Sequence, residues 1–109
     1  MNSPFICDMT AMTKAQRTRH HALGKQLRIS VIEFVELPNG YAARFPLQAE
    51  LVLLVAEFIT LERLCCPFFT FGLEVEKEGG PLWLKMTGDQ GIKPFIRAEF
   101  GIELERPDA

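Results

Sequence analysis

Two adjacent cysteines, Cys65 and Cys66, are the residues of this sequence best suited to chemistry. Paired thiolates suit soft metal ions, so zinc, copper or mercury is the class of ion that such a pair would bind. The alternative is that both side chains fill the core at the end of a helix, because free cysteine is among the most buried residue types.

Three physical points favour the core interpretation of the cysteine pair. Adjacent residues of a helix project about 100° apart, so both thiols would face one ligand only if the helix broke between them. The negative end of a helix and the nearby Glu62 both disfavour thiolates, although Arg63 would offset some of this charge. A disulfide between neighbours would be strained. Cys7 would be a third ligand only if the N-terminal segment folded back, and no sequence pattern predicts that.

Other polar residues give weaker signals. His20 and His21 are neighbours, so they splay apart and lack the i, i+4 spacing of a helical zinc site; we expect both on a basic surface. No base is placed to activate a cysteine nucleophile, so no catalytic residue is predicted and binding is favoured over catalysis. Phe68, Phe71 and Trp83 would line an apolar pocket, with packing in the sheet as the alternative for Trp83.

The length of 109 residues and the hydrophobic fraction of 48% are those of an ordinary single domain. A net charge of −2 gives no electrostatic case for nucleic acid, so that partner is not predicted. The longest mostly apolar run, 51–59, is far shorter than the roughly 20 residues of a membrane-spanning helix. Three cysteines are an odd number and two are neighbours, which argues against a disulfide framework and favours a reducing cytoplasm.

The sequence pattern of the first part of the chain predicts a surface helix and one ββα unit. Residues 1–11 would be a tail or a cover strand that contains Cys7. Thr13 would cap a helix within 12–27, and period-two alternation predicts strands over 29–36 and 41–45 around the turn Pro38-Asn39-Gly40. Apolar residues at helical spacing predict a central helix over 47–65, which Pro67 terminates.

The second part predicts another ββα unit. Strands are expected over 69–76, with Phe69, Phe71, Leu73 and Val75 inward, and over 81–86. Asp89 would cap a last helix over 90–100, and residues 105–109 would be frayed. The similar element order of 28–65 and 66–104 suggests an internal repeat. The prediction is therefore α+β: one helix followed by ββα–ββα, with a four-stranded antiparallel sheet and the helices on one face. The alternative is that the hairpins pair across a dimer.

The run Glu62-Arg63-Leu64-Cys65-Cys66-Pro67-Phe68-Phe69 resembles an uncharacterised bacterial family with an E-R-x-C-C-P-F motif. Similar segments are attached to mercury-resistance-type, metal-responsive regulators. The likeness covers about 58–95 and implies a sensing or accessory role in metal or toxicant response. Carried over residue by residue, it points to Glu62, Cys65 and Cys66. The chain lacks a recognisable helix-turn-helix, so DNA binding is not implied.

Two hypotheses of function follow. The first is a small cytoplasmic, non-enzymatic protein that binds a soft metal ion or a small effector through the cysteine pair or the aromatic pocket beside it. The second is a structural or interaction module, a homodimer or a binder of a regulatory partner protein, whose cysteines are core. No membrane partner is expected under either hypothesis.

Overall fold

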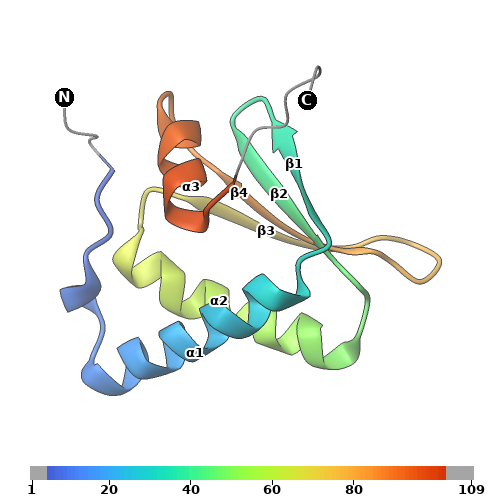
Figure 1. Cartoon of the computed structure of the whole chain (residues 1–109), viewed down its shortest axis with the longest axis horizontal. Coiled ribbons are helices and arrows are strands. Elements are labelled where there is room, and N and C mark those ends of the chain that lie inside the picture. The colour runs from blue at the N-terminus through green and yellow to red at the C-terminus, as the bar shows by residue number, and fades with distance from the viewer. Residues whose placement is uncertain (1–4, 103–109) are drawn as a thin grey trace.

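The computed structural model describes residues 5–102, which form an α+β fold with three α-helices and a four-stranded antiparallel sheet (Figure 1). This confirms the predicted fold class and element order. The elements in chain order are a 3₁₀ turn η1 (Met9–Ala11), α1 (Lys14–Ser30), β1 (Glu33–Leu37), β2 (Gly40–Phe45), α2 (Ala49–Cys65), β3 (Thr70–Val75), β4 (Leu82–Thr87) and α3 (Ile92–Phe100).

The sheet has the order β1-β2-β4-β3, so the second strand of each hairpin lies in the centre. The strands β2 and β4 pair antiparallel from Gly40 opposite Thr87 to Phe45 opposite Leu82. The register requires a glycine at position 40, because a Cβ there would lie 2.0 Å from the carbonyl oxygen of Met86. The two hairpins therefore pair within one chain, which is the first of the two predicted arrangements.

The core lies between one face of the sheet and the helices. Alternate residues of the two central strands face it, as expected for a sheet covered on one side. They are Tyr41, Ala43, Phe45, Leu82, Leu84 and Met86, and they join Leu51, Val55 and Phe58 of α2. The opposite face carries the ion pairs Arg44–Glu33 and Lys85–Glu74. The sheet thus holds α2 with its C-terminal end close to the N-terminal segment and α3 (Figure 1).

The helix α1 is longer than predicted and shortens the first strand. Thr13 caps it as expected, in a capping box with Gln16. It continues to Ser30, whereas the alternation from Ile29 had suggested a strand there. The helical stripe that contains the buried Leu23 and Leu27 packs the helix against the rest of the core. Tertiary packing therefore outweighs the short β-like alternation, and Ile29 remains exposed.

Two details of the second unit differ from the prediction. The register places Leu73 and Val75 on the core face of the sheet, opposite Leu84 and Leu82, as predicted. They are nevertheless 39% and 50% exposed, because this end of β3 runs out toward the β3–β4 turn, away from α3 (Figure 1). Asp89 is not the N-cap of α3. That position is Gly91 in the left-handed conformation, and the carbonyl of Asp89 accepts the N–H of Ile92 instead.

The predictions for the C-terminal segment and for an internal repeat are not tested by the structure. The frayed segment 105–109 and the end of the second unit at 104 lie outside the described residues. The two ββα units match in element order, while an internal sequence repeat stays a prediction. No helix within residues 5–102 is long and apolar enough to span a membrane.

Candidate metal site

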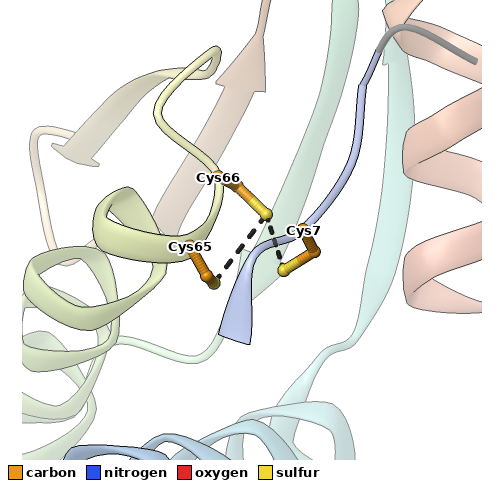
Figure 2. Close-up of side chains that lie close together, drawn as sticks. All are labelled: Cys7, Cys65 and Cys66. Carbon is orange, nitrogen blue, oxygen red and sulfur yellow. Dashed lines mark hydrogen bonds between the residues drawn. The ribbon is translucent and has the colours of Figure 1, made fainter. Parts of the chain in front are cut away.

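The helix α2 ends between the two cysteines. Cys65 is its last residue, and Cys66 is the C-cap, with φ −128° and ψ 69°, outside the helical region. The following Pro67 disfavours the α conformation at Cys66. Because the helix breaks here, the two side chains do not diverge by 100°, and their Sγ atoms lie 3.9 Å apart (Figure 2). The condition stated for convergence of the two thiols, a helix break between them, is therefore met.

Cys7 brings a third thiol to this corner. The N–H of Asp8 donates to the carbonyl of Cys65 over 2.9 Å, so the N-terminal segment does fold back onto the end of α2. The Sγ of Cys7 then lies 3.0 Å from the Sγ of Cys66 (Figure 2). All three cysteines are free, and their sulfurs lie within 4.8 Å of one another. Cys65 and Cys66 are buried, and Cys7 is partly exposed.

Aromatic packing holds the segment that carries Cys7. The ring of Phe5 packs at 5.1 Å from that of Phe68, which meets Phe95 of α3 edge-on at 5.2 Å. The three aromatic residues Phe68, Phe71 and Trp83, which were predicted to line one pocket, do not lie on the same side of the sheet. Phe71 pairs with Met86 on the core face, whereas Trp83 lies on the opposite face and donates to Glu76.

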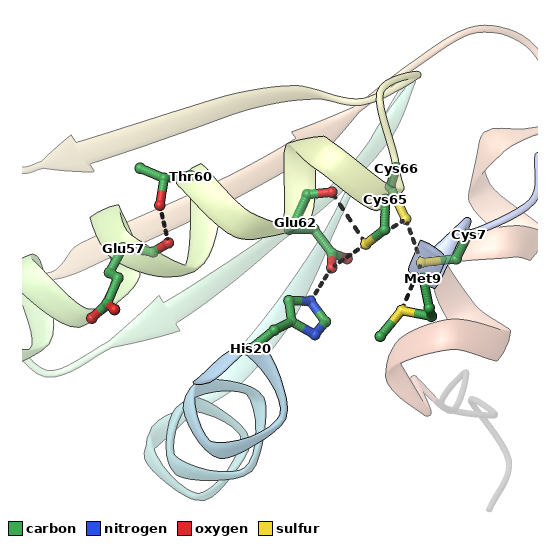
Figure 3. Close-up of polar contacts among 8 residues, drawn as sticks. All are labelled: Cys7, Met9, His20, Glu57, Thr60, Glu62, Cys65 and Cys66. Atoms are coloured by element: carbon green, nitrogen blue, oxygen red, sulfur yellow. Dashed lines mark hydrogen bonds and ion pairs between the residues drawn. The ribbon is translucent and has the colours of Figure 1, made fainter. Parts of the chain in front are cut away.

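A second polar group adjoins the thiols through Glu62. Its Oε1 lies 2.6 Å from His20 Nε2 and 3.5 Å from the Sγ of Cys65 (Figure 3). The side chains of His20 and Glu62 are 16% and 3% exposed. The imidazole also stacks on Phe58, with ring centroids 5.4 Å apart. His20, Glu62 and Cys65 form a second cluster of metal-ligating side chains, which shares Cys65 with the three-thiol cluster.

The sequence interpretation of His20 as a surface residue is therefore wrong, while His21 is exposed as expected. The reason is that α1 packs against α2 and covers one face of each helix. A signal was present in the spacing, because His20, Leu23 and Leu27 fall on one helical stripe and Leu23 and Leu27 are buried. The thioether of Met9 also lies near the site, 3.9 Å from the Sγ of Cys7, and no sequence pattern indicated it.

The electrostatics of the corner keep the two buried thiols neutral. Burial raises the pKa of both Cys65 and Cys66 far above the ordinary thiol value, the contact with Cys7 raises it further, and the negative charge of Glu62 adds to the effect. Arg63 is exposed, so its charge is solvated and offers little compensation. A nucleophilic cysteine needs a lowered pKa, so this environment does not favour covalent catalysis.

A search of family models, curated protein sequences and solved structures found no match to this chain. What the site does must therefore be argued from its geometry. The resemblance of the Glu62–Phe69 run to segments of metal-responsive regulators remains an expectation.

The three-thiol cluster is close to the dimensions of a metal site. A metal–sulfur bond of about 2.3 Å in tetrahedral geometry separates two sulfurs by about 3.8 Å. The Cys65–Cys66 separation of 3.9 Å already has this value. The Sγ of Cys7 lies 3.0 Å from that of Cys66, so it would need to move outward by about 0.8 Å to reach the tetrahedral separation. Cys7 is on an extended segment rather than in a helix or strand, so its side chain is the one best able to make that adjustment.

Proposed function

We propose that this protein binds a soft metal ion through the thiolates of Cys7, Cys65 and Cys66. The observation that carries the proposal is the convergence of three free sulfurs within 4.8 Å of one another, from segments 59 residues apart in the chain. Thiolate ligands select soft ions, and zinc, copper(I) and mercury(II) are the candidates.

The charge of the site favours a divalent ion. Three thiolates with a divalent cation leave one net negative charge, whereas copper(I) leaves two, in a corner where Cys65 and Cys66 have no exposed surface. An uncompensated charge in such a place costs several kcal/mol. The carboxylate of Glu62, which contacts Cys65, increases this difference. Zinc and mercury(II) are therefore preferred over copper(I).

Entry of the ion is through Cys7. It is the partly exposed member of the cluster, and its sulfur touches that of Cys66. An ion that first binds Cys7 passes inward by exchanging solvent ligands for Cys66 and then for Cys65. The raised pKa values of the buried thiols mean that the ion must displace their protons, which soft ions with high thiolate affinity do.

The rival function is an interaction module whose cysteines are only core residues. Burial of Cys65 and Cys66 is what favours it. It predicts that removal of a thiol changes stability alone, because no ligand is lost. The two functions therefore differ in what happens to the metal when a single sulfur is replaced by oxygen.

Titration of the fully reduced protein with mercury(II), zinc and copper(I) tests the proposal. The expected result is one ion per chain, retained through desalting in native mass spectrometry, with all three thiols protected from alkylation. Cys7→Ser should weaken zinc binding by at least about tenfold, as should Cys66→Ser. Glu57→Gln is the matched control, since Glu57 lies on α2 but pairs with Arg19 on the surface. If the wild type binds no tighter than Cys7→Ser, the proposal is overturned.

A further inference from the structure

A cavity of about 260 Å³ lies between α1, α2, α3 and the core face of the sheet, and none of the three cysteines lines it. Its walls are mostly apolar and include four phenylalanines: Phe34, Phe45, Phe58 and Phe100. A space of this size is just below the usual range for small-molecule pockets, about 300–1,000 Å³. It accepts a small ligand with an apolar or aromatic body.

The cavity exists because a glycine interrupts the inward stripe of α1. His20, Gly24 and Leu27 recur at helical spacing on α1, and all three line the space together with Val31, the C-cap of the helix. A Cβ at Gly24 would meet no atom within 4 Å. Glycine within a helix costs roughly 0.5–1 kcal/mol relative to alanine, yet here no packed neighbour requires it. The missing side chain leaves open volume between His20 and Leu27.

The polar lining of the interior is acidic. Glu62 is 2% exposed and lines the cavity. Its Oε1 is hydrogen-bonded to Nε2 of His20 and accepts a hydrogen bond from the Sγ of Cys65. Within residues 5–102 the other carboxylate oxygen, Oε2, has no hydrogen-bond donor. Glu99 stands at the mouth on α3, and its pKa is raised by partial burial and by the charge of Glu62. The field of Glu62 therefore extends across the cavity to its rim.

Apart from His20, the basic residues of the lining do not contact Glu62 in the described part of the chain. His21, Lys25 and Arg28 are all on α1 and all exposed, so their charges are solvated and screened. The imidazole of His20 is the one base in contact with Glu62 in the described part of the chain. No fully buried side-chain oxygen within residues 5–102 lacks a hydrogen-bond partner, so the unpaired Oε2 of Glu62 keeps some accessible surface. A largely buried carboxylate with one such oxygen is stabilised most by a cationic donor that reaches it.

We propose that this cavity is a binding site for a small organic cation, an ammonium group on an apolar or aromatic body. The ammonium donates to Oε2 of Glu62, and the body packs among Phe34, Phe45 and Phe58, whose ring faces also attract a cation. The site is separate from the thiol cluster and does not depend on a bound metal, although Glu62 adjoins both.

Titration calorimetry on the reduced, chelator-treated protein compares the binding of three probes that share a phenyl ring on a short chain and differ in charge. The probes are 2-phenylethylammonium, the neutral 2-phenylethanol and the anionic 3-phenylpropanoate. We expect the ammonium to bind most tightly and Glu62→Gln to weaken it by about ten- to a hundredfold, the loss of a charge-assisted contact. Glu57→Gln, at a half-exposed position of the same helix that pairs with Arg19 and does not line the cavity, should leave it unchanged.

The position of the site is tested by filling it. Gly24→Leu should abolish binding of the ammonium while the circular dichroism spectrum and thermal unfolding show a folded protein. Gly24→Ala, which adds one methyl group into open space, should weaken binding without loss of fold. Unchanged binding in both variants would overturn the location, and equal or tighter binding of the alcohol or the anion would overturn the ligand class.

The two proposals fail independently. The same probe titration is repeated in Cys7→Ser/Cys66→Ser, which lacks the thiol set but keeps the cavity. Binding of the ammonium should be preserved there, whatever the outcome of the metal titrations. Absence of ammonium binding at millimolar concentration in both proteins would overturn the cavity proposal and leave the metal proposal untouched.

Discussion

The Sγ of Cys7 lies 3.0 Å from the Sγ of Cys66, although 59 residues separate them. The contact is fixed by the backbone, because the N–H of Asp8 donates to the carbonyl of Cys65. It is also fixed by aromatic packing of Phe5 on Phe68. The N-terminal segment thereby converts a pair of core thiols into a cluster of three, and the pair alone would lack an accessible member.

Replacement of His20 should destabilise the protein, whereas replacement of its neighbour should not. His20→Ala removes the partner of a carboxylate that is 97% buried, and this should lower the free energy of unfolding by about 1–3 kcal/mol. His21→Ala adds the same alanine at the next, exposed position and should change it by less than about 0.5 kcal/mol. Urea unfolding of the two variants measures the difference. Equal effects would contradict the pairing of His20 with Glu62.

Neutralisation of Glu62 should make the buried thiols easier to ionise. Its negative charge contributes to the raised pKa of Cys65 and Cys66, so Glu62→Gln should lower both pKa values. Burial is the larger cause, and therefore the values should stay above that of a free thiol. Thiolate absorbance as a function of pH measures the change. Glu57→Gln keeps the same helix and should give the wild-type titration; a shift there of similar size would contradict a local effect.

The sequence was sufficient for the fold but not for the full site. The period-two segments, the Asn39-Gly40 turn and the apolar stripe of α2 act locally, and they gave the correct fold class and order of elements. Cys7 and His20 could not be assigned in the same way. Their roles depend on the fold-back of an aperiodic segment and on the packing of α1 against α2, which are tertiary events. Cys65 and Cys66 converge because the helix ends between them, which is the one condition under which the sequence allowed both thiols to face a single ligand.

Stability should fall in mildly alkaline solution. An unfolded thiol titrates near pH 8.5, while the pKa values of Cys65 and Cys66 in the folded state are raised. Below about pH 8.5 both states keep these protons, and the free energy of unfolding should not depend on the two thiols. Above it the unfolded state releases protons that the folded state retains, so stability falls by up to about 1.4 kcal/mol per pH unit for each thiol.

Urea unfolding with reductant between about pH 7 and about pH 9.5 measures this slope. The Cys65→Ala/Cys66→Ala variant provides the comparison, since it lacks both groups and should show a flatter dependence. It should also be less stable at neutral pH, because each substitution removes a packed sulfur from the core. Parallel slopes for the two proteins would contradict the raised pKa values.

Metal binding should release protons in proportion to the buried thiols that coordinate. Cys65 and Cys66 are neutral at pH 7, so each must lose its proton to become a ligand. Zinc binding should therefore release at least two protons per ion, and the apparent affinity should rise by about a hundredfold per pH unit below the pKa values. Calorimetric titrations in two buffers of different ionisation enthalpy give the proton count. Cys66→Ser should lower it by one, and a count near zero for the wild type would show that the ion binds elsewhere than at the buried sulfurs.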